Sequence, residues 1–235
     1  MGSFFNVCIY RIPRRESIIF PPSHCPKCGT PLKFYDNIPV VSYLLLGGRC
    51  RYCKEKISPI YPITELTTGI LYVGLYIHYG TNLFLFFTFL IFVSFLIIIT
   101  FIDLEHMIIP DILVFPGIFI GLLLSLIRGD TIFLDSLLGL LIGGGVIFLI
   151  VFLSRGGMGE GDIKLSAMIG SFLGVKFTII TLLSSFILGG IVGILLLFLK
   201  IKSRKDPIPF GPFLALGAIL SLFWGQTIAN IWGWY

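Results

Sequence analysis

Long apolar segments separated by short polar ones run along most of this chain. They do not alternate with period two, as membrane β-strands do, but continue without interruption for nearly the 20 or so residues that a helix needs to cross a bilayer. An apolar segment at residues 1–10 is expected to be a first membrane helix that is short or truncated. Further spans are expected near residues 62–79, 83–102, 111–127, 134–153, 162–173, 177–199 and 209–232. The pattern therefore predicts about eight transmembrane helices, with a turn at Gly174-Val175-Lys176 between two of them.

Residues 11–60 have a different character, because they are polar and basic and contain several prolines. We interpret them as a small extramembrane module between the partial first helix, residues 1–10, and a membrane-embedded domain, residues 61–235. Over the whole chain 56% of residues are hydrophobic and 12% are charged, about half the roughly 25% of soluble domains. The mean hydropathy of +1.00 also indicates an integral membrane protein. The fold class expected is an all-α polytopic membrane protein.

The placement of basic residues predicts an orientation. Loops in the cytoplasm collect Lys and Arg. If residues 11–60 are cytoplasmic and the spans alternate, 15 basic residues fall on the cytoplasmic side and only Arg128 and Lys176 fall outside. The same alternation places Asp103 and Asp162 on the cytoplasmic side, and this orientation rests on the basic residues alone.

Four of the five cysteines form two Cys-x-x-Cys pairs, Cys25/Cys28 and Cys50/Cys53, with 21 residues between them. Two such turns can aim four thiolates at one ion in the tetrahedral arrangement that suits zinc, and four ligands leave no open position for catalysis. The alternatives are a dithiol redox site and disulfides, and a reducing cytoplasm disfavours stable disulfides. Cys8 stands alone and is interpreted as a small buried apolar residue.

Carboxylates gather where two of the predicted spans meet the membrane boundary. Ionisable groups at membrane depth are costly, so each is a candidate for function, although ordinary interfacial charges are the alternative. Two carboxyls sharing one proton can activate water and polarise a peptide carbonyl. Glycines beside one of them let a substrate strand approach the backbone. We take Asp103 and Asp162 as the catalytic pair, with further substrate or loop candidates at Glu105, Asp111, Gly159, Gly161 and Lys164.

Together, these motifs resemble those of a known family, the bacterial type IV prepilin peptidases, which are GxGD aspartyl proteases. The resemblance rests on CPKCG (25–29) and CRYC (50–53), on IDLEHMIIPD (102–111) and GMGEGDIKL (157–165), and on PIPFGPF (207–213). The N-terminal segments 2–7 and 10–13, the segments 37–43 and 47–50, and the helix entry at 61–66 also match. Glu65 lies in that entry and is interpreted either as lining the site or as capping a helix.

The resemblance implies a function. Asp103 and Asp162 would cleave the leader peptide of type IV prepilins or pseudopilins at the cytoplasmic face of the bacterial inner membrane. N-methylation of the new N-terminal residue with S-adenosylmethionine would follow, and Gly48 is the candidate cofactor-binding residue. The expected partners are prepilins and the lipid bilayer, not nucleic acid. Two rival hypotheses are a non-enzymatic membrane docking or assembly protein with a zinc module, and a presenilin-type protease with transmembrane substrates.

Overall fold

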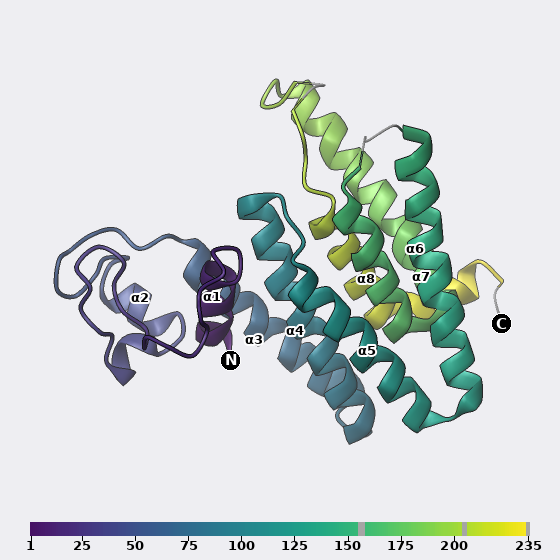
Figure 1. Cartoon of the computed structure of the whole chain (residues 1–235), viewed down its shortest axis with the longest axis horizontal. Coiled ribbons are helices and arrows are strands. Elements are labelled where there is room, and N and C mark those ends of the chain that lie inside the picture. Colours follow the sequence, from purple (N-terminus) through teal and green to yellow (C-terminus); the bar gives the residue numbers. More distant parts are fainter. Residues whose placement is uncertain (155–157, 204–205, 234–235) are drawn as a thin grey trace. The chain divides into compact units, whose positions relative to one another are not determined.

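The computed structural model of the chain describes residues 1–154, 158–203 and 206–233. Within these ranges it is helical and contains no β-strand, which confirms the predicted all-α class. The helices in Figure 1 are α1 (Gly2–Arg11), η1 (Phe34–Asn37), α2 (Val41–Leu45), α3 (Ile60–Tyr79), α4 (Leu83–His106), α5 (Asp111–Arg128), α6 (Asp130–Ser154), α7 (Glu160–Phe198) and α8 (Gly211–Ile231). The chain forms two compact units, Met1–Phe86 and Phe87–Tyr235. The division into residues 1–10, 11–60 and 61–235 rests on where the chain is expected to enter the membrane, not on compactness, and it stays a prediction.

Six helices in the described part of the chain, α3 to α8, are long and apolar enough to cross a membrane. The outer stripe of α3 shows why lipid suits them: Ile63, Leu66, Ile70, Val73 and Ile77 recur at intervals of three and four residues, and each is at least half exposed. Such a stripe would be unfavourable in water and is favourable against acyl chains. The protein is thus a multi-pass membrane protein. With its 10 residues α1 is too short to span by itself, so the count of eight stays a prediction.

The 39-residue α7 breaks at the predicted turn, because Gly174 has φ 73° and ψ −178°, a conformation that favours glycine. Ser166 and Thr178, on either side of the break, would be about 18 Å apart in a straight helix. A Cβ built on Gly143 would nevertheless touch the Ser166 carbonyl and lie 3.2 Å from Cγ2 of Thr178. The two halves therefore fold back on each other as a helical hairpin, in which the backbone N–H of Val175 donates to Asp135 of α6 (3.2 Å).

Small residues bring the first half of α7 against α6. Gly139 and Gly170 leave no room for a Cβ between the two backbones, and the hydroxyl of Ser166 donates to the Gly143 carbonyl (2.9 Å). Close approach at small residues, supported by hydroxyl hydrogen bonds, is how helices associate in lipid. Helices α6, α7 and α8 lie together in Figure 1, and α5 packs against α6 and α7. This packing fixes the start of α7, where Asp162 lies.

Candidate active site and metal-binding cluster

Asp103 lies in the last turn of α4 and is 4% exposed. Its Oδ2 accepts a hydrogen bond from the backbone N–H of Gly211 (3.0 Å), the first residue of α8. The first N–H groups of a helix have no partner inside the helix, and the helix dipole favours negative charge at that end. The start of α8 is therefore a suitable partner for a buried carboxylate in a membrane helix.

Asp162 lies in the first turn of α7 and is 6% exposed. Its Oδ2 accepts a hydrogen bond from the backbone N–H of Gly159, the N-cap residue (3.2 Å), and its own N–H donates to the Gly159 carbonyl (3.1 Å). An acidic side chain that reaches back to the N-cap amide is half of a capping box. Both predicted catalytic carboxylates are thus held by backbone amides at the start of a helix.

The segment between α4 and α5 brings the two carboxylates together. After Asp103 the chain turns at Met107, whose φ of 54° ends α4, and Ile109 packs against the starts of both α7 and α8. A Cβ on Gly161 would lie 2.8 Å from Cβ of Ile109, and one on Gly211 would lie 3.4 Å from its Cδ1. Gly211 donates to Asp103 and Gly161 directly precedes Asp162, so both carboxylates lie beside Ile109. The site therefore combines groups from three helices around Ile109.

Asp111 and Lys164, two of the predicted substrate or loop candidates, form an ion pair with each other. Nζ of Lys164 lies 2.7 Å from Oδ1 and 2.9 Å from Oδ2 of Asp111, and it also lies 5.6 Å from the centre of the Phe115 ring. Asp111 begins α5, and Lys164 follows Asp162 by two residues. The pair ties the start of α5 to the start of α7 and so supports the position of Asp162.

The other candidates lie in different surroundings. Glu105 is partly exposed and lies 3.8 Å from Nε2 of His106. Glu65 belongs to the N-terminal unit, where its carboxylate accepts hydrogen bonds from the Ser3 hydroxyl (2.6 Å) and the Val40 backbone N–H (2.8 Å). It therefore ties α1 and the start of α2 to α3. Gly159 and Gly161 lie at the site, as already described, and Gly157 lies outside the described residues.

The amide of Gly211 is the site group that the sequence did not point to. The segment PIPFGPF carries part of the family resemblance, but the sequence assigns it no role. A signal was available in the start of α8, where Pro212 follows Gly211 in the first turn, because a helix start near a membrane boundary offers unpaired N–H donors. Without the fold, nothing in the sequence said which acid those donors would meet.

The two cysteine pairs adopt the same backbone turn. In the first, the Cys25 N–H donates to the Thr30 carbonyl (3.0 Å) and the Gly29 N–H to the Cys25 carbonyl (2.9 Å). In the second, the Cys50 N–H donates to the Glu55 carbonyl (2.8 Å) and the Lys54 N–H to the Cys50 carbonyl (3.1 Å). Gly29 and Lys54 both have positive φ, 67° and 61°. The chain thus contains two equivalent Cys-x-x-Cys turns.

These turns bring the four sulfurs together, as the spacing predicted. Sγ atoms of Cys25, Cys28, Cys50 and Cys53 lie within 4.8 Å of one another, and none of them is in a disulfide. A hydrogen bond with Thr30 lowers the pKa of Cys28 to about 6, whereas desolvation and the neighbouring thiols raise the pKa of Cys53 to about 11. The cluster can hold a metal ion. Cys8 lies apart from it, buried in α1.

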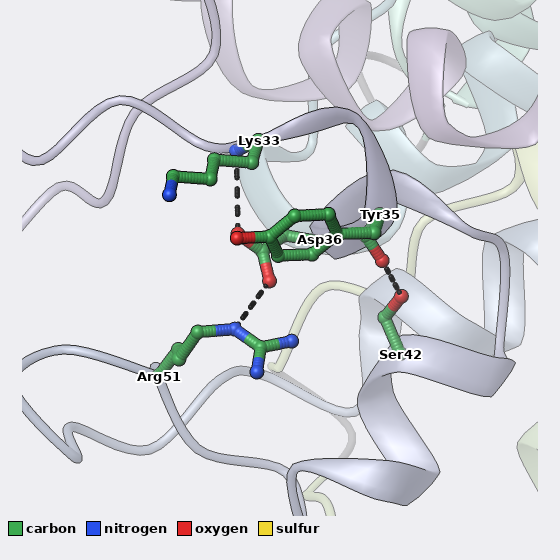
Figure 2. A network of polar contacts seen from close by, with 5 residues as sticks. All are labelled: Lys33, Tyr35, Asp36, Ser42 and Arg51. Atoms are coloured by element: carbon green, nitrogen blue, oxygen red, sulfur yellow. Dashed lines mark hydrogen bonds and ion pairs between the residues drawn. The ribbon is translucent and has the colours of Figure 1, made fainter.

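A polar network supports the second turn (Figure 2). The Asp36 carboxylate accepts hydrogen bonds from Nε of Arg51 (2.8 Å) and from the Lys33 backbone N–H (3.2 Å), and the Ser42 hydroxyl donates to the Tyr35 carbonyl (2.6 Å). The hydrogen bond that Arg51 donates to Asp36 raises the pKa of Arg51 above its usual value, so this guanidinium stays charged. Since Arg51 lies between Cys50 and Cys53, the network ties η1 and α2 to the cysteine cluster.

Comparisons with known proteins match almost the whole chain. Residues 1–79 match the bacterial peptidase A24 N-terminal domain, and residues 90–194 match the type IV leader peptidase family. Three similar proteins are each named prepilin leader peptidase/N-methyltransferase. The Pseudomonas aeruginosa protein is 33% identical over 98% of this chain and 89% of its own length. Those of Aeromonas salmonicida and Legionella pneumophila are 35% and 34% identical over 100% of this chain and 90% of their own lengths. No solved structure matches the chain. With this identity over nearly its full length, the chain belongs to the type IV leader peptidase family.

Proposed function

We propose that this protein is an aspartic endopeptidase of the bacterial inner membrane that removes the leader peptide from type IV prepilins or pseudopilins and then methylates the new N-terminus. The observation that carries the proposal is the pair of buried carboxylates, Asp103 and Asp162, each held by a backbone amide at a helix start. The relatives named prepilin leader peptidase/N-methyltransferase support both activities.

The chemistry follows from sharing one proton between two acids. Like charges at close range resist ionising together, so one carboxyl stays protonated while the other is a base. The base removes a proton from a water molecule, whose oxygen attacks the scissile carbonyl, while the acid donates its proton to the carbonyl oxygen. The tetrahedral intermediate then releases the leader with a new carboxylate, and the leaving nitrogen takes a proton to become the amine of the mature pilin.

We place the active site on the cytoplasmic face. Three of the 15 basic residues predicted on the cytoplasmic side, Arg155, Arg204 and Lys205, lie outside the described residues. Contacts within the described ranges fit the predicted alternation of the membrane spans. Asp103 and Gly211, which lie at the expected cytoplasmic ends of the spans 83–102 and 209–232, are hydrogen-bonded. Asp135 and Val175, which lie at the opposite end of the spans 134–153 and 162–173, are hydrogen-bonded too. Both contacts fit an α7 that folds back at Gly174 as two spans, and with α1 as a first span this supports eight membrane passages.

Zinc is the metal that we assign to the cysteine cluster. A tetrahedron with Zn–S bonds of about 2.3 Å has S–S edges of about 3.8 Å. The Sγ atoms of Cys25 and Cys53 are 3.8 Å apart, which matches one such edge, and all four sulfurs lie within 4.8 Å of one another. Four protein ligands would close its coordination shell, so the metal would stabilise the module and take no part in peptide cleavage.

The methyl group would come from S-adenosylmethionine, whose sulfonium transfers it to the new N-terminal amine. Gly48 remains our candidate for that cofactor's site; it has φ +67°, and a Cβ built on it would lie 2.9 Å from the hydroxyl oxygen of Tyr43. The non-enzymatic docking protein is not favoured, because the relatives carry an enzyme name. The presenilin-type alternative predicts cleavage within generic membrane peptides.

A reconstituted assay tests the proposal. We expect purified protein in lipid to cut a prepilin at its leader junction, and to add one methyl group only when S-adenosylmethionine is present, as read by mass spectrometry of the products. A transmembrane peptide without a leader should stay intact. Folded, metal-loaded protein that leaves the prepilin whole would contradict the proposal, and cleavage of the generic peptide would favour the presenilin-type alternative.

Replacing Gly211 by Ala should slow leader cleavage strongly. The new Cβ would lie 2.6 Å from Oδ2 of Asp103, so either the carboxylate or the start of α8 must move. A displacement of about 1 Å in a catalytic group can cost about 100-fold in rate. The matched control is Gly190→Ala on α7, where a Cβ meets nothing within 4 Å. Steady-state cleavage rates of the two variants test this, and equal rates would show that the Gly211 contact does not position Asp103.

A further inference from the structure

The N-terminal unit has a cavity of about 510 Å³ beside the second cysteine turn. It is lined by Tyr43, residues 47–49 and residues 56–59. Two of the lining residues, Arg49 and Lys56, are cationic, and none is acidic. The peptidase chemistry proposed above uses neither cation. Gly48, our candidate for the S-adenosylmethionine site, lines the same cavity, so the methyl donor and any other ligand of Arg49 and Lys56 compete for it.

Arg49 and Lys56 face each other directly. They form an isolated antiparallel β-bridge, which places the two side chains opposite one another. Like charges in that position are destabilising. Both residues are exposed, and neither side chain forms an ion pair within the described part of the chain. In the first turn the equivalent bridge joins His24 to Pro31 and brings no two cations together. The like-charge pair is therefore particular to the turn that borders the cavity, and a bound anion would relieve it.

The surroundings of the cavity indicate where such an anion would come from. Pro59 lines the cavity, and the membrane-spanning helix α3 begins at the next residue, so the cavity lies where the chain enters the lipid. Leu44 and Leu45, adjacent in sequence to Tyr43, are 69% and 81% exposed. Apolar side chains beside cations are typical of surfaces that lie at the boundary between headgroups and acyl chains.

We infer that this cavity binds the phosphate of an anionic phospholipid headgroup, with Arg49 and Lys56 as its ligands and the leucines of α2 in contact with the acyl region. This lipid site is independent of the proposed peptidase reaction. It would anchor the metal-binding module at the membrane surface. A zwitterionic lipid would bind less well, because its own cation would meet Arg49 and Lys56.

The test is a titration of detergent-purified, metal-loaded protein with short-chain phosphatidylglycerol, phosphatidylcholine or inorganic phosphate, following thermal stability. Phosphatidylglycerol should stabilise the wild type most. Each basic residue near an anionic lipid surface contributes about a fivefold gain in affinity, so Arg49→Gln/Lys56→Gln should bind about thirtyfold more weakly. The matched control is Arg15→Gln/Lys27→Gln, which removes two exposed cations outside the cavity and should bind as the wild type does.

Three outcomes would overturn the inference. One is equal binding of phosphatidylglycerol by the cavity variant and the control. Another is equal stabilisation by inorganic phosphate alone, which would assign the cavity to a soluble phosphate. The third is stabilisation by S-adenosylmethionine that depends on Arg49 and Lys56, which would assign it to the methyl donor. If the double variant loses its metal, the salt dependence of wild-type binding decides, since an ion contact at the surface must weaken with added salt.

Discussion

Asp103→Asn and Asp162→Asn should each abolish leader cleavage while leaving the protein folded. Asparagine keeps the size of the side chain and can still accept a hydrogen bond from the Gly211 or Gly159 amide, so the starts of α8 and α7 keep their partners. It can neither take a proton from water nor donate an acidic one. Loss of one member of a catalytic group typically lowers the rate on the order of 10⁴-fold or more.

The matched control is Asp206→Asn, which removes a carboxylate from an exposed loop before α8, where it accepts a hydrogen bond from the Ser203 N–H. Leader cleavage by this variant should equal that of the wild type. Rates should be compared at equal helix content by circular dichroism and equal metal content. If Asp103→Asn kept the wild-type rate, Asp103 would not be a catalytic residue, and Glu105, two residues further along α4, would be tested next.

Patterns within a few residues of the sequence predicted two main features of the structure, the break in α7 and the cysteine cluster. The interruption of an apolar run at Gly174-Val175-Lys176 predicted the break in α7, because glycine adopts the backbone conformation that reverses the chain. The Cys-x-x-Cys spacing predicted the sulfur cluster, because each turn closes on its own backbone. In both cases the controlling interactions lie within a few residues, so the sequence displays them directly.

The contacts that the sequence did not show join residues far apart in the chain. Gly211 and Asp103 are 108 residues apart, and the donor is a backbone amide, which no residue type announces. Asp135 caps the second half of α7 from 40 residues away and could have been an ordinary interfacial charge. For Glu65 two roles were expected, lining the site or capping a helix, and its partners Ser3 and Val40 became visible only once α1 and α2 were placed against α3.

Loss of the metal should unfold the cysteine module. Structural zinc contributes roughly 10–16 kcal/mol in small zinc-binding peptides, whereas a whole domain is stable by only about 5–15 kcal/mol. Little regular structure holds residues 11–60 together: between α1 and α3, the described part of this region has only the short helices η1 and α2 and two isolated β-bridges. Cys50→Ser should therefore lose the ion and expose this region to proteases. Metal content by elemental analysis and limited proteolysis measure both effects.

Cys8→Ser provides the control for that experiment, because Cys8 is buried in α1, outside the cluster, and its loss leaves all four ligands in place. This variant should keep one metal ion per chain and the wild-type protease pattern. Cleavage of Cys50→Ser should fall within residues 11–60 and spare α5 to α8, since those helices pack against one another in the second unit. A Cys50→Ser protein that kept both its metal and its protease resistance would show that the four thiolates do not form the metal site.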